Sequence, residues 1–135
     1  MLKQVGETVI NSVHKSTCHC GAVELKIQLP EGIVDPRRCN CSICRRKGAI
    51  AGSVALSGIE IVKGEDKLEL YRFDTKEAEH YFCKICGIYT HHRRRSNPNQ
   101  YGINLGCLEG VDPNLIEDVK LYDGANNHPS DKPVS

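Results

Sequence analysis

Cys39-Asn40-Cys41-Ser42-Ile43-Cys44 is the stretch on which the rest of the chain depends. It puts three thiols within six residues, and basic side chains flank it on both sides, namely Arg37, Arg38, Arg45, Arg46 and Lys47. Three thiolates this close together can bind one metal ion, and a tetrahedral zinc takes four ligands. Either a distant residue supplies the fourth ligand, which makes the site structural, or the position stays open for water or substrate, which makes it reactive.

Four more cysteines form two pairs that lie far apart in the sequence, Cys18-His19-Cys20 and Cys83-Lys84-Ile85-Cys86. Gly21 and Gly87 each follow the second thiol of a pair, and a glycine there can adopt positive φ and turn backbone N–H groups toward the sulfurs. We interpret the pairs as one closed four-thiolate zinc site, which is structural because it leaves no position for substrate. The alternatives are four unrelated buried thiols, or a thioredoxin-like redox pair at Cys83 and Cys86, which would need a βαβ context that the sequence lacks.

The eighth cysteine, Cys107, ends an apolar strand-like stretch with no other thiol beside it. It is interpreted either as a buried, inert thiol or as the fourth ligand of the second metal. His91 and His92 are other candidates for that position, and strand alternation lets only one of them face inward.

Composition limits the class of protein. At 135 residues the chain is predicted to be one domain with a modest core, and its formal charge of +1 gives no long-range attraction to nucleic acid or to an anionic membrane. We expect no signal peptide and no run of about 18 apolar residues that could span a membrane, so the protein is predicted to be soluble and cytoplasmic. Disulfides across such closely spaced cysteines would constrain almost nothing, so metal binding in a reduced compartment is the preferred interpretation.

The hydrophobic pattern predicts a small, mainly β, mostly antiparallel domain over residues 1–123 and a flexible tail over residues 124–135. The clearest strand is residues 23–29, where Val23, Leu25, Ile27 and Leu29 alternate with polar residues. Residues 1–17 predict an edge strand, and the thiol triplet is expected to be irregular. Further strands are predicted at residues 49–56, 59–63, 67–73, 78–83, 88–91, 101–105 and 119–122. Residues 64–66 are expected to join two of them as a hairpin, and Asp112-Pro113 predicts one short helix through Glu117.

The three cysteine motifs, in this order, resemble those of the glutathione-dependent formaldehyde-activating enzyme (GFA) family, which includes the centromere protein V-like proteins. The resemblance also covers His92-Arg93-Arg94-Arg95-Ser96-Asn97-Pro98 and residues 104–108, and extends over about residues 16–122. It implies the β-tent fold and two zinc ions per chain. It assigns Cys18, Cys20, Cys83 and Cys86 to a structural zinc, and Cys39, Cys41 and Cys44 to a second, catalytic zinc with an exchangeable fourth position.

The named activity of that family joins glutathione to formaldehyde to give S-hydroxymethylglutathione, and it is classed as a carbon–sulfur lyase. The resemblance therefore implies a small thiol and an aldehyde as substrates, with glutathione as co-substrate. Arg45, Arg46 and Arg93 are candidates to bind the carboxylates of such a thiol, since guanidinium groups pair well with carboxylates. No oligomeric state and no general acid follow from the sequence.

Two other functions stay open at this stage. One is a zinc-stabilised binding module whose arginines contact a protein or nucleic acid, although the near-neutral charge and the scarcity of aromatic residues count against nucleic acid. The other is a sensor in which oxidation of the triplet releases zinc. The fourth ligand of the second metal discriminates among these functions, because a displaceable group favours catalysis.

Overall fold

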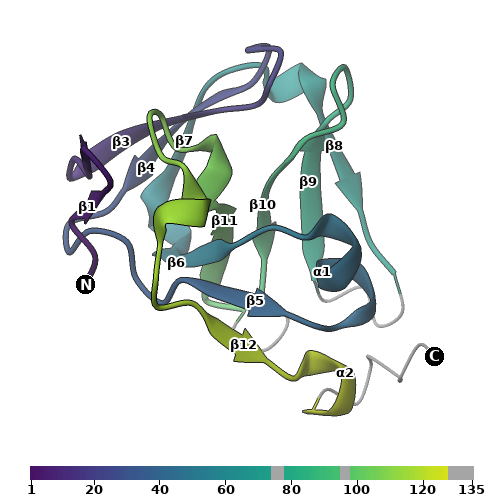
Figure 1. Cartoon of the computed structure of the whole chain (residues 1–135). Coiled ribbons are helices and arrows are strands. Elements are labelled where there is room, and N and C mark those ends of the chain that lie inside the picture. The colour runs from purple at the N-terminus through teal and green to yellow at the C-terminus, as the bar shows by residue number, and fades with distance from the viewer. Residues whose placement is uncertain (74–77, 95–97, 128–135) are drawn as a thin grey trace.

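Two β-sheets enclose the hydrophobic core of this computed structural model, which describes residues 1–73, 78–94 and 98–127 (Figure 1). Among the described residues, the larger sheet has seven strands, in the spatial order β12 (Lys120–Tyr122), β5 (Arg37–Cys39), β6 (Ala51–Ala55), β11 (Gln100–Asn104), β10 (Tyr89–Arg93), β9 (Glu79–Cys83) and β8 (Leu68–Tyr71). The smaller sheet has the order β3 (Val13–Thr17), β4 (Glu24–Gln28) and β7 (Ile59–Lys63). Neighbouring strands pair antiparallel, except that β12 runs parallel to β5, so the predicted mainly β, antiparallel class is confirmed.

Strand β4 shows how the alternating sequence forms the core. Leu25 and Ile27 are 1% and 0% exposed, whereas Lys26 and Gln28 face water on the other side of the sheet. Because successive side chains point to opposite faces of a strand, this pattern buries one whole face of β4. The opposite wall of the core comes from the larger sheet and the turn after it, with Val54, Ile103 and Leu105. Each such side chain stabilises the fold by about 1.5–3 kcal/mol when fully buried.

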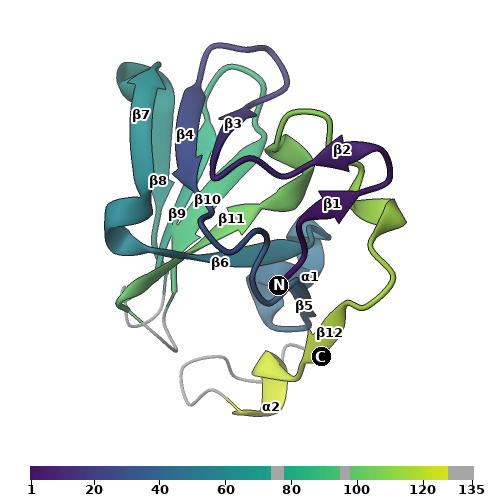
Figure 2. The same ribbon diagram turned by 90° about the vertical axis from the view of Figure 1, so that its left-hand side faces the viewer.

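The predicted hairpin around residues 64–66 is wrong. Strand β7 pairs with β4 in the smaller sheet, while β8 pairs with β9 in the larger one, so the two strands lie in different sheets (Figure 2). Gly64, with φ of 85°, and the 3-10 helix Glu65–Lys67 redirect the chain from one sheet to the other. The turn residues were recognised from the sequence, but their spacing does not specify which strand each arm pairs with.

The thiol triplet is regular rather than irregular. Cys39 ends strand β5, and helix α1 (Ser42–Lys47) follows directly and ends at Gly48, whose backbone N–H donates to Cys44 O in a left-handed cap with φ of 65°. The basic residues Arg45, Arg46 and Lys47 occupy the last turn of α1, where they interact favourably with the helix dipole. The triplet therefore lies where strand β5 turns into helix α1.

The remaining elements are short. Strands β1 (Gln4–Val5) and β2 (Thr8–Val9) form a small hairpin before β3, and 3-10 helices occupy Leu56–Gly58, Leu105–Cys107 and Pro113–Leu115. The predicted helix at residues 112–117 is thus a single 3-10 turn, capped by the Asp112 side chain, which accepts from Asn114 N at 3.0 Å. Of the predicted flexible tail, residues 124–127 form helix α2 (Gly124–Asn127), and residues 128–135 lie outside the described residues.

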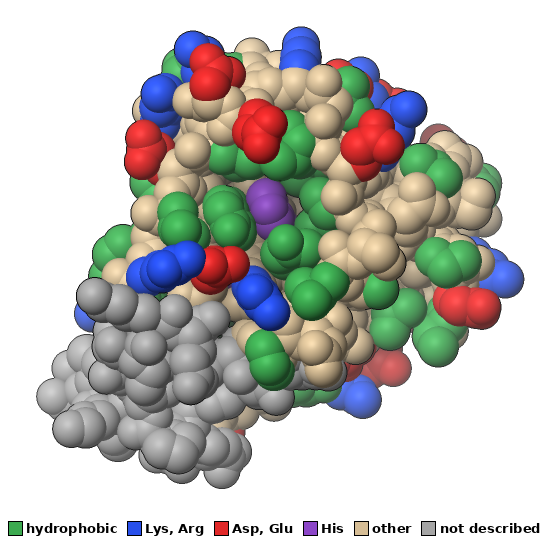
Figure 3. Space-filling model, turned by 180° about the vertical axis from the view of Figure 1, so that it is seen from behind, with side chains coloured by type: hydrophobic (Ala, Val, Ile, Leu, Met, Phe, Trp, Pro, Cys, Tyr) green, Lys and Arg blue, Asp and Glu red, His purple; other side chains and the backbone are tan. Residues whose placement is uncertain are grey.

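Charged side chains of both signs are interspersed on the face of the molecule seen from behind, consistent with the formal charge of +1 (Figure 3). None of the helices in the described part of the chain has the length and apolarity needed to cross a bilayer.

Candidate metal centres

The first thiol cluster joins two turns that are about 65 residues apart in the sequence. Cys18 and Cys20 lie in the turn between β3 and β4, whereas Cys83 ends β9 and Cys86 lies in the turn from β9 to β10 (Figure 1). The four sulfurs all lie within 4.8 Å of one another, with Cys20 Sγ 3.7 Å from both Cys18 Sγ and Cys83 Sγ. Four thiolates around a tetrahedral zinc, at Zn–S of about 2.3 Å, have sulfurs about 3.8 Å apart, so this donor set fits zinc.

Backbone N–H groups donate to two of these thiols, as predicted from the glycine that follows each cysteine pair. Val23 N donates to Cys18 Sγ at 3.3 Å and Ile85 N donates to Cys83 Sγ at 3.4 Å. Gly21 and Gly87 have φ of 80° and 78°, which glycine adopts without steric cost. Cys18 and Cys83 are almost completely buried, so this cluster lies at the edge of the core, between the smaller sheet and the larger one.

The second thiol cluster comes from a single stretch of chain. The sulfurs of Cys39, Cys41 and Cys44 lie within 4.8 Å of one another, and Cys41 N donates to Cys39 Sγ at 3.4 Å. Hydrogen bonds from the Cys41 and Cys44 thiols lower the pKa of Cys39 to about 2. In the part of the chain that the structure describes, no fourth Cys, His, Asp or Glu belongs to this group. Three thiolates fit a zinc ion that keeps one position for another ligand.

None of the candidate fourth ligands predicted for the triplet belongs to this group of thiols in the described residues. The Cys107 thiol is buried and donates to Tyr89 O at 3.6 Å, and burial together with the charges of Cys18 and Cys86 raises its pKa to about 12. Both of these neighbouring thiols belong to the four-thiol cluster and not to the triplet. His91 stacks on Tyr81 with ring centroids 4.6 Å apart, and burial lowers its pKa to about 4. His92, on the opposite face of β10, lies 2.6 Å from the Tyr89 hydroxyl through Nδ1.

The segment after β12 packs against the triplet, which the sequence did not indicate. Asn40, between the first two thiols, donates to Asp123 Oδ1 at 2.9 Å and accepts from Ala125 N at 3.1 Å. These bonds hold Gly124 so close that a Cβ there would lie 2.6 Å from Cys39 Sγ. Gly124 N also donates to Cys39, which favours the thiolate form. Residues that were expected to belong to a flexible tail therefore form one wall of the three-thiol cluster.

Lys47, which is half-buried, is a cation that interacts with the triplet. Lys47 Nζ donates to His80 Nδ1 at 2.8 Å and lies 3.7 Å from the centroid of the Tyr89 ring. Burial lowers the pKa of Lys47 to about 8, while the nearby Cys44 and Cys41 thiols act in the opposite direction. The lysine therefore supplies positive charge beside the three sulfurs from within the protein.

The arginines predicted to bind substrate have other surroundings. Arg45 and Arg46 are exposed on α1, and Arg46 donates to Ser42 O within that helix at 2.7 Å. Arg93 donates to Pro98 O at 2.9 Å and shares a strand face with His91, opposite to the face that carries His92. Their role in substrate binding stays a prediction.

Two other arginines, Arg37 before the triplet and Arg94 in the basic run after β10, meet at Ser53. Ser53 Oγ on β6 accepts from Arg37 Nη1 at 2.8 Å and from Arg94 Nη1 at 3.2 Å. Strand register aligns Ser53 with Gly102 and Gly102 with His92, and a Cβ at Gly102 would collide with the His92 ring. The glycine at position 102 is a cue in the sequence for this close approach. The convergence of Arg37 and Arg94 has no such cue, because it depends on the order of the strands in the sheet.

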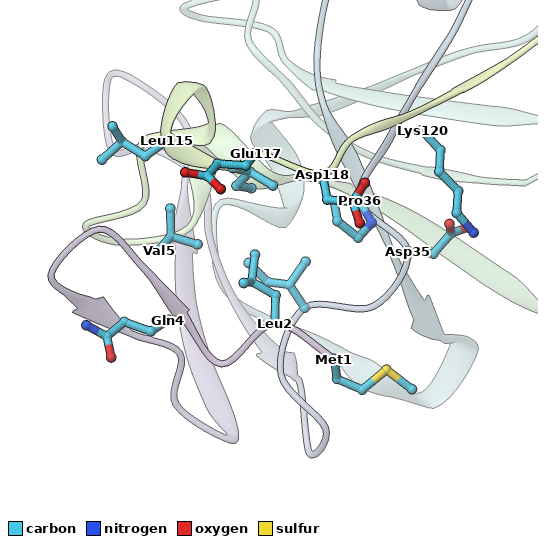
Figure 4. Close-up of a pocket in the computed structure, with 12 residues that line it drawn as sticks. Met1, Leu2, Gln4, Val5, Asp35, Pro36, Leu115, Glu117, Asp118 and Lys120 are labelled. Carbon is cyan, nitrogen blue, oxygen red and sulfur yellow. The ribbon is translucent and has the colours of Figure 1, made fainter.

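A cavity of about 540 Å³ lies between the N-terminal segment and residues 115–120 (Figure 4). Its walls come from the N-terminal segment, residues 33–36 and residues 115–120, with apolar Leu2, Val5 and Leu115 and the charged Asp35, Glu117 and Lys120. No cysteine lines it, so it adds nothing to the metal centres.

Comparison with known proteins gives a consistent result. The family model for the glutathione-dependent formaldehyde-activating enzymes matches residues 13–123. A crystal structure of a Rhodobacter sphaeroides protein is 54% identical, with a TM-score of 0.77, and the match covers 80% of this chain and 99% of that one. A Halomonas elongata protein that carries a provisional form of the same family name is 32% identical over 80 residues. That match covers 53% of this chain and only 50% of the length of the relative.

Proposed function

The chain belongs to the glutathione-dependent formaldehyde-activating enzyme family, and from this premise we propose that it adds a thiol to an aldehyde at a zinc ion held by Cys39, Cys41 and Cys44. A second zinc, held by Cys18, Cys20, Cys83 and Cys86, is structural. The observation that carries the proposal is the difference between the two donor sets, four thiols in one and three in the other among the described residues. A three-thiolate site keeps a position for an incoming ligand, which a closed four-thiolate site does not.

The proposed reaction is a lyase-type addition, run in the direction of carbon–sulfur bond formation. The thiol sulfur attacks the aldehyde carbon, the C–S bond forms, and the electron pair of the C=O π bond moves to the oxygen. The thiol loses one proton and the oxygen takes one up, so glutathione and formaldehyde give S-hydroxymethylglutathione with no net change in protons. When bound, zinc lowers the pKa of a coordinated thiol or water, and so makes a nucleophile available near neutral pH.

The residues of this chain hold and tune that position. Cys39, Cys41 and Cys44 supply three corners of the site from one strand-to-helix turn. Lys47 offsets the negative charge of the thiolates, and its contacts with His80 and Tyr89 hold the ammonium group in place. Gly124 leaves room for the Cys39 sulfur and donates a backbone hydrogen bond to it. Orientation of two small reactants in such a site lowers the entropic part of the barrier.

The test is the rate at which glutathione and formaldehyde exchange with their adduct, measured by NMR exchange against a protein-free blank. The blank matters because thiols add to formaldehyde without a catalyst. We expect the zinc-loaded protein to exceed the blank and Cys41→Ser to return to it. Cys107→Ser is the matched control, because it removes a buried thiol that lies outside both clusters and keeps a hydrogen-bond donor toward Tyr89 O.

Two results would contradict the proposal. If the wild type does not exceed the blank, and glutathione leaves the spectrum of a cobalt-substituted triplet unchanged, the protein is not an enzyme for this thiol. A binding module stabilised by zinc, or a thiol sensor, then becomes the leading function. If Cys41→Ser keeps the wild-type rate, the activity does not depend on the three-thiol cluster.

A further inference from the structure

Arg37 is a buried cation whose side chain lies on the same strand face as the Cys39 thiol. It begins strand β5, and because side chains two residues apart lie on one face of a strand, its side chain and that of Cys39 share a face. Arg37 is 5% exposed. Its Nη1 donates to Asp35 O at 3.1 Å and to Ser53 Oγ at 2.8 Å, and lies 3.5 Å from Asp35 Oδ2.

The other terminal nitrogen of this guanidinium is unsatisfied. Within the described residues, Arg37 Nη2 is buried and has no hydrogen-bond partner. Arginine stays protonated in proteins and has five N–H donors, so it cannot avoid the cost of burial by losing its charge. The nearby carboxylate is not dedicated to it either, because Asp35 Oδ2 also accepts from the Tyr122 hydroxyl at 2.7 Å. A buried donor on a charged group is costly to leave without an acceptor.

A second guanidinium meets the first. Arg94, two residues after His92 and on the same face, is half-buried and donates through Nη1 to Ser53 Oγ at 3.2 Å and to Gln100 Oε1 at 2.6 Å. Burial and the charge of Arg37 lower the pKa of Arg94, while Cys39 is among the groups that act in the opposite direction. Two like charges thus converge on one hydroxyl, and the nearer strand, β5, carries the Cys39 thiol on the same face as Arg37.

We propose that Arg37 and Arg94 form a subsite that binds a carboxylate of the thiol substrate beside the three-thiol cluster. This inference rests on the proposed function, since the thiol is the reactant that the cluster would take. A carboxylate is the matching ligand because its two oxygens accept from parallel N–H groups of a guanidinium fork. It would satisfy Arg37 Nη2 and relieve the repulsion between the two cations.

The subsite makes the protein selective for acidic thiols. A thiol that carries a carboxylate, such as glutathione, is held by its sulfur at the cluster and by its charge at the arginines. A neutral thiol keeps the first contact and loses the second. The selection therefore depends on Arg37, which is buried on β5, and on Arg94, which is half-buried directly after β10.

The experiment compares two thiols and one non-thiol by calorimetric titration of the zinc-loaded full chain. The ligands are glutathione, its diethyl ester, which has no carboxylate charge, and S-methylglutathione, which keeps the carboxylates but cannot present a thiolate. We expect the wild type to bind glutathione at least about tenfold more tightly than the ester, as the loss of a charge-assisted hydrogen bond implies. Arg94→Gln and Arg37→Gln should reduce that preference to near unity. Arg38→Gln, the matched control, should keep it, because Arg38 is exposed on the opposite face of β5.

The ligands separate failure of this inference from failure of the proposed function. If glutathione is preferred over its ester in wild type and equally in Arg94→Gln, the subsite is wrong while the thiol reaction stands. If neither thiol binds, but S-methylglutathione binds and loses affinity in Arg94→Gln, the thiol reaction is wrong and the carboxylate subsite stands. If S-methylglutathione and glutathione both fail to bind, the subsite is wrong. Melting curves identify any loss of folding in Arg37→Gln, and the half-buried Arg94 keeps the test decisive in that case.

Discussion

The two thiol clusters use the same side chain and differ in where their donors come from. The four-thiol cluster takes two donors from the turn after β3, one from the end of β9 and one from the turn after it, so a metal held there would crosslink the two sheets. The three-thiol cluster takes all its donors from residues 39–44 and crosslinks nothing. Ligand separation along the chain therefore decides how much a metal contributes to folding, because only distant ligands restrict the unfolded chain.

The surroundings differ in the same sense. Around the four-thiol cluster lie core residues such as Val23 and backbone donors, with Cys18 and Cys83 inside the hydrophobic cluster itself. Around the three-thiol cluster lie Lys47, His80 and the Arg37–Arg94 pair. Perturbed charged groups gather at functional sites more often than at structural ones. This contrast supports chemistry at the second cluster and structure at the first.

The strongest test of the contrast replaces one thiol in each cluster. We expect Cys83→Ser to lower the free energy of unfolding severely, because structural zinc contributes on the order of 10 kcal/mol in small zinc modules, and the larger core here softens that figure. Cys41→Ser should leave the fold largely intact. Thermal unfolding with metal analysis of each variant measures this, and equal melting temperatures for the two variants would show that the roles are not divided in this way.

Metal removal tests the same division without mutation. A mild chelator should take about one zinc equivalent quickly, from the three-thiol cluster, and leave about one bound with the circular dichroism spectrum unchanged. The physical reason is that a site with an exchangeable position admits a competing ligand. Cys41→Ser serves as control, since it should start with about one equivalent and show no rapid phase. Simultaneous loss of both metals would mean that the clusters are alike.

Substituting one lysine near each cluster tests how the surroundings affect metal binding. Lys47→Met removes the half-buried cation beside the triplet. We expect about tenfold weaker metal binding there, since interactions between opposite charges in a protein reach a few kcal/mol. Lys84→Met removes an exposed lysine that follows Cys83 and should change neither metal. Competition with a metal indicator measures both affinities. An unchanged affinity in Lys47→Met would show that the lysine does not stabilise the thiolates.

The smallest effects are expected from two glycines. Gly87→Ala places a side chain at φ of 78° in open space, so only backbone strain of about 1–2 kcal/mol should appear, as a lower melting temperature. Gly124→Ala places a Cβ 2.6 Å from Cys39 Sγ and should weaken metal binding at the triplet with little change in melting. Measuring both quantities for both variants gives a cross-check, and the reverse pattern would contradict the division of roles.

Local patterns in the sequence were sufficient for several features. The alternation of Val23, Leu25, Ile27 and Leu29 predicted β4 and its buried face, and the spacing of the cysteines predicted which thiols would gather into two groups. The positive φ of Gly21 and Gly87 could be predicted because this conformation depends on a single residue, for which glycine is the favoured type. Such features depend on neighbours in the chain, whose distances the covalent geometry limits.

Only the tertiary structure decided what lies around those thiols. Gly124 approaches Cys39 because Asn40 binds the segment after β12, and Arg37 meets Arg94 because β6 and β11 place β5 and β10 on either side of Ser53. The hairpin predicted around residues 64–66 was wrong for the same reason, since β7 and β8 pair with strands of different sheets. Strand pairing and the convergence of distant charges follow from the packing of the whole chain, which gains free energy by burying both sheets against one core, and no short stretch of sequence contains that information.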